Sequence, residues 1–199
     1  MKQKFSLVSM VLVLSLFVSC DNNEKKDAQE TKKVETVVKS ETSKTITEQE
    51  VLEAQKIWGD GIVTIGNIYL EKGDYTAAAE KHISDLYGYN LGAVLFKPTL
   101  ASEKQFRTTK EGALSYFVGH NADYPEDHGF AIKPWSAVRW ESTGIKINGN
   151  MAIAMGNYFF TPTKGGDEVK VEYTFAYTKD DDGKLRIIMH GSHLPYSPK

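Results

Sequence analysis

The spacing of apolar positions predicts a long amphipathic helix at the start of the folded part of the chain. Between Val51 and Tyr69, apolar residues recur at the three- and four-residue intervals of one helix face. Thr47 and Glu50 stand three residues apart just before this run, the pattern of a capping box. Glycines interrupt the helix, which predicts close approach of another element or a bend; they are Gly59, Gly61 and Gly66.

Three shorter elements are expected next. Gly73-Asp74 breaks the first pattern, and Asp74 is a suitable N-cap for a second helix whose apolar positions run from 77 to 87. The apolar run 93–96, ended by Pro98, predicts a short strand. Residues 109–118 predict a third helix, and the polar segment 120–128 predicts a loop.

After Gly129 the period changes from helical to alternating, which predicts four strands. Asn148-Gly149 is a strong two-residue hairpin signal between the first two. The strands are expected at 136–147, 150–160, 169–177 and 185–192. Helices followed by a strand meander predict an α+β fold, in which a curved antiparallel sheet wraps around the long helix and leaves a pocket at its open end.

The N-terminal segment is interpreted as an export signal. Two lysines precede an apolar run, 5–18, that is shorter than the about 20 residues of a membrane-spanning helix. Residues 1–19 are therefore expected to be a signal peptide, and Leu16-Phe17-Val18-Ser19-Cys20 resembles a lipobox, which implies acylation of Cys20. The alternative is an ordinary secretory signal with a cysteine there by chance.

This interpretation divides the chain into three parts. Residues 20–45 have the polar composition of a flexible tether, and residues 46–199 form the folded domain. The protein is then expected in the cell envelope, held to a membrane through acylated Cys20, either periplasmic or associated with the outer membrane.

The composition and net charge of the chain limit the kinds of protein that it can be. Hydrophobic residues make up 41% and charged residues 25% of the chain, an ordinary globular balance. The formal net charge of -2 argues against a nucleic-acid partner, because such proteins usually carry a basic stripe. Cys20 is the single cysteine, so no disulfide within the chain supports the fold.

The folded part resembles the iota-class carbonic anhydrases from about Trp58 to Tyr196. The matching stretches are Gly88-Tyr89-Asn90-Leu91-Gly92, Leu95-Phe96-Lys97-Pro98-Thr99, Gln105-Phe106-Arg107, Ser115-Tyr116-Phe117-Val118-Gly119, Tyr124-Pro125-Glu126-Asp127-His128-Gly129-Phe130, Ala154-Met155-Gly156-Asn157-Tyr158-Phe159-Phe160 and Lys170-Val171-Glu172-Tyr173-Thr174-Phe175. The resemblance implies an NTF2-like cone, the arrangement also found in the association domain of calmodulin-dependent kinase II, and reversible hydration of CO₂ to bicarbonate.

The C-terminal signature of that family, usually His-His-Ser-Ser, reads His190-Gly191-Ser192-His193 here. The first and third positions match, and the second and fourth do not. Because side chains alternate along a strand, His190 and Ser192 are expected to point together into the cone, and Gly191 and His193 away from it.

By motif match, the resemblance implies that Thr99 and Tyr116 meet His190 and Ser192 in the pocket. Hydroxyl groups there would orient water and bicarbonate, and His190 would accept a proton or fix the serine hydroxyl. Apolar walls for CO₂ are expected from three aromatic residues of the strands: Tyr173, Phe175 and Phe159.

The five histidines show no spacing typical of a zinc site, so a metal-free site is expected, although zinc or manganese has been claimed for some members of the family. A homodimer or larger homo-oligomer is expected to form through the outer face of the meander, where Tyr158 and Phe160 are predicted to be exposed. The alternative function is a non-catalytic module that binds a small ligand or serves as an oligomeric scaffold.

Overall fold

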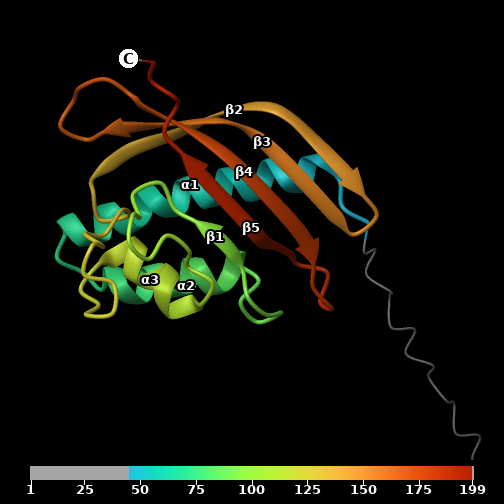
Figure 1. Ribbon diagram of the computed structural model, residues 1–199, viewed down its shortest axis with the longest axis horizontal. Coiled ribbons are helices and arrows are strands. Elements are labelled where there is room, and N and C mark those ends of the chain that lie inside the picture. The colour runs from blue at the N-terminus through green and yellow to red at the C-terminus, as the bar shows by residue number, and fades with distance from the viewer. Residues whose placement is uncertain (1–44, 199) are drawn as a thin grey trace, which may run out of the picture. The chain divides into compact units, whose positions relative to one another are not determined.

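The computed structural model describes residues 45–198, which form three helices and one five-stranded sheet (Figure 1). The predicted signal peptide, Cys20 and nearly all of the predicted tether lie outside the described residues. In chain order the elements are α1 (Glu48–Leu70), α2 (Tyr75–Leu86), β1 (Leu95–Lys97), α3 (Lys110–Val118), β2 (Trp135–Asn148), β3 (Met151–Pro162), β4 (Val169–Lys179) and β5 (Leu185–His193).

Helix α1 begins at the predicted capping box. The Thr47 hydroxyl accepts a hydrogen bond from the Glu50 backbone N–H at 3.2 Å, and the Glu50 carboxylate accepts one from the Thr47 backbone N–H at 2.8 Å. One face of the helix, including Trp58, Ile62 and Ile65, is buried. The helical spacing in the sequence therefore corresponds to the face that packs into the core.

The glycines of α1 allow the close approach that the sequence suggested. A Cβ on Gly61 would lie 2.1 Å from Nδ1 of His82 in α2, and one on Gly59 would lie 3.1 Å from Nε1 of Trp140 in β2. Both neighbours pack directly against the helix backbone. Helix α1 is thus held between α2 and the sheet with little space on either side.

The sheet has the strand order β1-β5-β4-β3-β2. Its last four strands form the predicted antiparallel meander, and Asn148 pairs with Met151 across the predicted hairpin turn. Strand β1 instead pairs in parallel with β5, so the complete sheet is mixed rather than antiparallel. The helices cover one face of this sheet, here called the inner face (Figure 1).

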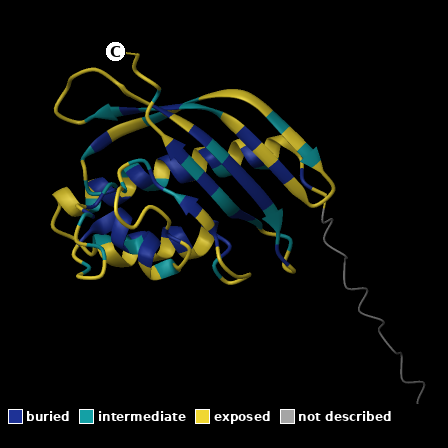
Figure 2. Cartoon of the chain, viewed as in Figure 1, coloured by how far each residue is buried: buried dark blue, intermediate teal, exposed yellow. Residues whose placement is uncertain are grey.

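Burial separates the two faces of the sheet (Figure 2). On β4, alternate residues are buried on the inner face: Val171, Tyr173, Phe175 and Tyr177. The prediction for β3 was wrong, because Tyr158 and Phe160 are buried on the inner face and Phe159 lies on the outer face under the Arg139 guanidinium. Tyr158 pairs with Val171, and directly paired residues share a face.

Within residues 45–198, no helix has both the length and the apolar character needed to cross a membrane.

Candidate active site

The parallel pairing of β1 with β5 brings together residues that are about ninety positions apart in the sequence. Phe96 pairs with His190, and Lys97 pairs with Gly191. Thr99 follows two residues after Lys97, so it lies beside Ser192. A strand of only three residues therefore positions the predicted threonine against the predicted serine.

Four hydroxyl groups meet at this point, and we call them the hydroxyl cluster: Thr99, Tyr116, Tyr158 and Ser192. Thr99 Oγ1 lies 2.5 Å from Ser192 Oγ, which also bonds to the Tyr158 hydroxyl. The Tyr116 hydroxyl, from α3, interacts with Thr99 and accepts a hydrogen bond from the Leu100 backbone N–H at 3.4 Å. Three of the four residues were predicted from the sequence, and Tyr158 was missed because β3 was assigned the opposite face.

The phenols of the cluster remain protonated near neutral pH. Burial raises the pKa of Tyr116 to about 12 and raises the pKa of Tyr158 further above its ordinary value. The cluster therefore offers neutral O–H groups, which can donate to oxygen atoms and accept from water.

The imidazole of His190 is stacked between two phenyl rings. Its centroid lies 4.0 Å from that of Phe175 and 4.7 Å from that of Phe96, with nearly parallel planes. Both rings come from the strands that pair with β5 on either side. Burial, with a smaller contribution from the charge of His193, lowers the pKa of His190 to about 3, so the ring is neutral at physiological pH.

Two tyrosines contact the two ring nitrogens of His190. The Tyr87 hydroxyl lies 2.9 Å from Nδ1, and the Tyr158 hydroxyl lies 3.4 Å from Nε2. Trp58 Nε1 donates a hydrogen bond to the Tyr87 hydroxyl at 2.9 Å. No pattern in the sequence points to Tyr87 or Trp58 as site residues, because the end of α2 and the middle of α1 meet β5 only in the folded structure.

Two adjoining hollows of about 110 Å³ each open beside the hydroxyl cluster. Thr99 lines one and Tyr116 lines the other, and Leu100, Phe130 and Lys133 line both. The walls of the hollow at Thr99 are otherwise mainly apolar and include Trp135, Phe160, Val169, Val171 and Leu194. Both are much smaller than the pockets of about 300–1,000 Å³ that hold drug-sized ligands, so only a small substrate fits here.

The aromatic walls predicted from the sequence differ from those observed. Phe159 is a correction, because it points to the outer face. Tyr173 and Phe175 are buried on the inner face, but neither lines the two hollows beside the cluster. Phe175 acts on the site by stacking on His190, and the hydroxyl of Tyr173 accepts a hydrogen bond from Gln55 at 3.3 Å.

The altered signature affects only the outer face. His190 and Ser192 are buried among the core side chains, as the strand alternation predicted. His193 is exposed, and a Cβ on Gly191 would meet only His193 at 3.5 Å and the Thr174 carbonyl oxygen at 3.9 Å. The residues that depart from the usual pattern therefore do not contact the hydroxyl cluster.

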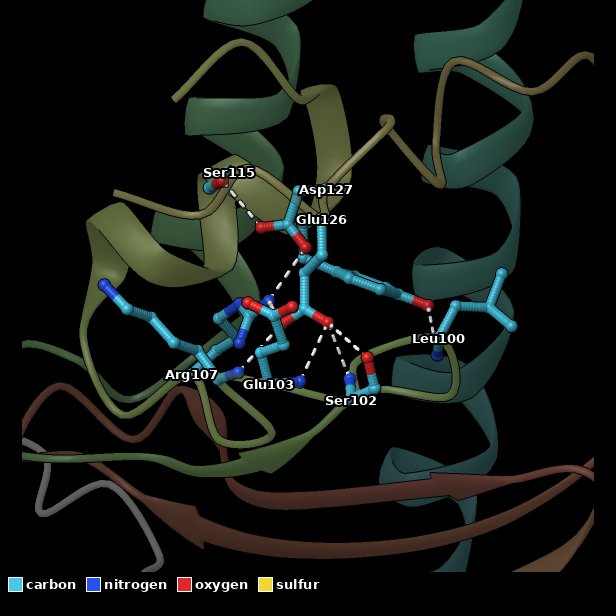
Figure 3. A network of polar contacts seen from close by, with 9 residues as sticks. Leu100, Ser102, Glu103, Arg107, Ser115, Glu126 and Asp127 are labelled. Atoms are coloured by element: carbon cyan, nitrogen blue, oxygen red, sulfur yellow. Dashed lines mark hydrogen bonds and ion pairs between the residues drawn. The ribbon is translucent and has the colours of Figure 1, made fainter. Parts of the chain in front are cut away.

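A buried ion pair supports the loop that carries Thr99 (Figure 3). Arg107 follows this loop, and its Nη2 donates a hydrogen bond to Asp127 Oδ1 at 2.8 Å; both side chains are fully buried. Ser115 on α3 donates to the other oxygen of Asp127 at 2.6 Å. The Tyr124 ring covers the guanidinium at 4.5 Å. One carboxylate thus joins the Thr99 loop to the helix that carries Tyr116.

Glu126 holds the same loop through its backbone (Figure 3). Its carboxylate accepts hydrogen bonds from the backbone N–H groups of Ser102, Glu103 and Lys104 at 2.7, 3.0 and 2.8 Å. These donors lower the pKa of Glu126 to about 2, so the contact stays charged at neutral pH. Its contribution to stability is present above pH about 4.5 and is lost as the pH falls toward 2.

Comparison with known proteins identifies the family. A family model described as metal-independent carbonic anhydrase matches residues 49–194. A metal-independent carbonic anhydrase from Nostoc sp. (strain PCC 7120) is 45% identical over 194 residues, which cover 96% of this chain and 92% of that protein. The chain belongs to the family of metal-independent carbonic anhydrases. The resemblance found in the sequence is thereby confirmed.

The solved structure of a carbonic anhydrase agrees with this family assignment. The crystal structure of a cyanobacterial iota-carbonic anhydrase complexed with bicarbonate superimposes with a TM-score of 0.76 and 50% identity, over 78% of this chain and 96% of that chain. A nuclear transport factor 2-like protein from Salmonella enterica is similar with a TM-score of 0.47 and 14% identity, over 76% and 92% of the two chains. The expected α+β fold is confirmed, apart from the parallel edge strand.

The expectation of a site without a metal agrees with the description of the family as metal-independent. In the part of the chain that the structure describes, no three His, Cys, Asp or Glu side chains are grouped closely enough to hold a metal ion. The hydroxyl groups around Thr99 are neutral and protonated, which makes them weak ligands for zinc or manganese.

The buried ion pair yields a stability prediction. In Asp127→Asn, Arg107 keeps its charge and loses its nearest carboxylate, with Glu126 at 3.5 Å as its remaining anionic partner, which should lower the free energy of unfolding by roughly 3 kcal/mol. Denaturant unfolding followed by circular dichroism measures this loss. The control is Glu141→Gln, which breaks an exposed pair with Arg139 and should leave the unfolding midpoint almost unchanged. Equal effects of the two substitutions would contradict the structural role of the buried pair.

Proposed function

We propose that this chain catalyses the reversible hydration of CO₂ to bicarbonate without a metal ion. The observation that carries the proposal is the hydroxyl cluster at the edge of a small, mainly apolar hollow. Apolar walls suit CO₂, and O–H groups at one end suit water and the oxygen atoms of bicarbonate. Membership of the metal-independent family supports the same reaction.

The chemistry that this site supports is positioning and hydrogen bonding. A water molecule held by Thr99 and Ser192 forms a bond from its oxygen to the CO₂ carbon, and one C=O electron pair moves onto the oxygen. Hydroxyl donors stabilise the charge that develops there. A second water molecule takes up the released proton. Lys133, which is exposed and lines both hollows, favours the anionic product there.

The alternative is a non-catalytic binding module, which departures from the family signature would favour if they altered the pocket. Gly191 and His193 lie on the outer face, so these departures leave the groups beside the hollow unchanged. A binding module would retain bicarbonate affinity without turnover. The rate of CO₂ hydration distinguishes the two functions.

Substitution of the cluster should reduce that rate. Ser192→Ala and Thr99→Val each remove one hydroxyl with little change in volume, and we expect kcat/KM for CO₂ hydration to fall roughly 10- to 100-fold. Stopped-flow measurement with a pH indicator, with and without chelator, tests this. The control is Thr174→Ala, which removes a hydroxyl from the outer face of β4. Activity lost on chelation and regained with added metal would refute the metal-free reaction.

We also propose that the protein forms a homodimer or larger homo-oligomer through the outer face of the sheet. Apolar side chains lie side by side there, because Ile153 pairs with Ala176, Ala176 with Met189, and Met189 with Leu95. Ile153 and Leu95 are 48% and 64% exposed in the single chain, and association would remove this surface from water. These residues replace Tyr158 and Phe160 as the expected contact.

A charge placed in this row should prevent association. We expect Ile153→Lys to shift the sedimentation coefficient of the protein from that of the oligomer to that of the monomer, because a lysine amine cannot be buried between apolar surfaces without a partner. Lys164→Glu, a charge change at an exposed position in the turn between β3 and β4, is the control. A monomeric wild-type protein would contradict the proposal.

Attachment to a membrane is a further part of the proposed function. The lipobox-like stretch that ends at Cys20 supports lipidation, and the two lysines with the apolar run before it support export to the cell envelope, periplasmic or associated with the outer membrane. Two or more acyl chains anchor a protein stably. The enzyme would then interconvert CO₂ and bicarbonate beside a membrane.

Metabolic labelling tests this attachment. We expect a bacterial host fed a radioactive or clickable fatty acid to label the wild-type protein, and Cys20→Ala to abolish the label, because this is the single thiol in the chain. Ser19→Ala, which keeps a small residue before the cysteine, is the control and should retain the label. A wild-type protein that is exported without label would support the ordinary secretory signal.

A further inference from the structure

The polar contacts behind the hydroxyl cluster form one continuous chain that ends in the core. From the core outward the chain consists of Trp58, Tyr87, His190, Tyr158, Ser192 and Thr99. Trp58, Tyr87 and His190 are almost completely buried, so water does not compete for their hydrogen bonds. The direction in which each group donates can therefore be worked out from the chemistry of the groups.

The direction of hydrogen-bond donation along this series of groups is set at its buried end, by Trp58. The indole Nε1–H of Trp58 can only donate, so the Tyr87 oxygen accepts at that contact. The second polar contact of the Tyr87 hydroxyl within the described residues is Nδ1 of His190 at 2.9 Å. The single proton of Tyr87 therefore donates to Nδ1, and burial keeps this phenol protonated by raising its pKa well above the ordinary value.

This arrangement specifies the tautomer of His190. Because Nδ1 accepts, a neutral imidazole carries its proton on Nε2, which then donates to the Tyr158 oxygen. Tyr158 is left to donate its own proton to Ser192, and Ser192 donates to Thr99. Thr99 then donates to the Tyr116 hydroxyl, which also accepts from the Leu100 backbone N–H, so the Tyr116 proton is left to point toward the hollow that Tyr116 lines.

We propose that Tyr87, held by Trp58, is a positioning residue that fixes the Nε2–H tautomer of His190 and thereby orients the hydroxyl cluster to donate toward the substrate hollow. His190 then acts as a neutral donor within the core. Its one basic nitrogen faces Tyr87 and not the hollow, so it does not take the proton released during hydration. The effect on turnover rests on the proposed carbonic anhydrase activity, whereas the tautomer does not.

Nitrogen NMR of the full-length wild-type protein tests the tautomer directly. We expect the His190 resonances to show a protonated Nε2 and an unprotonated Nδ1, with no change between pH 8 and pH 5. The low pKa of about 3, caused by burial between the phenyl rings, predicts this constancy. A proton on Nδ1 at pH 7, or a doubly protonated ring, would overturn the assignment whether or not the protein is active.

Tyr87→Phe tests the consequence for turnover. The ring remains and the donor to Nδ1 is removed, so we expect the Nδ1–H tautomer to appear in the NMR spectrum. We also expect kcat for CO₂ hydration to fall about tenfold, a change of about 1.4 kcal/mol, with KM changed less than about twofold. Tyr177→Phe is the matched control, because it removes a buried hydroxyl that contacts Gln55 instead of His190.

The outcomes separate this inference from the proposed function. Unchanged kcat and an unchanged tautomer in a folded Tyr87→Phe variant would overturn the positioning role, while normal wild-type activity would still support the enzyme. A wild-type protein without CO₂ hydration would overturn the proposed function and the effect on kcat together. Equal losses in Tyr87→Phe and Tyr177→Phe would reduce the effect to a general loss of core stability and overturn the specific role.

Discussion

The parallel contact between β1 and β5 is the constraint on which the site depends. It places Phe96 beside His190 and, two residues after the strand, Thr99 beside Ser192. Three residue pairs make a weak ladder by themselves, since parallel pairing is slightly less stable per residue than antiparallel pairing. The stacking of Phe96 on His190 and the ion pair at the end of the Thr99 loop hold this edge from both sides.

Electrical neutrality distinguishes the hydroxyl cluster and His190 from the site of a metal-dependent enzyme. The phenols of the cluster have raised pKa values, and the imidazole behind them has a depressed pKa. A neutral site avoids the large desolvation cost of an unpaired buried charge. It must then obtain its catalytic effect from the orientation of dipoles, which requires rigid surroundings. The stacked rings around His190 and the ion pair behind Thr99 supply that rigidity.

Local patterns in the sequence were sufficient to predict most elements and the buried faces of β4 and β5, but not that of β3. The Thr47–Glu50 capping box and the Asn148-Gly149 turn depend on neighbours a few residues away, and the pattern of β5 correctly placed His190 and Ser192 inside. Strand β3 has apolar residues on both faces, so its alternation is ambiguous. Its register with β4, which pairs Tyr158 with Val171, sets which face is buried. The parallel pairing of β1 and the role of Tyr87 depend on contacts between distant segments, which no local pattern contains.

The outward direction of Gly191 and His193 has a consequence for how related chains are recognised. A four-residue motif on a strand is two interleaved motifs, one that faces the core and one that faces the surroundings of the protein. In this chain the core-facing half is the half that meets the hydroxyl cluster. A sequence search that requires all four residues of the signature would therefore discard chains whose pocket is intact. A search that weights His190 and Ser192 together with the distant Thr99 and Tyr158 would follow the chemistry instead.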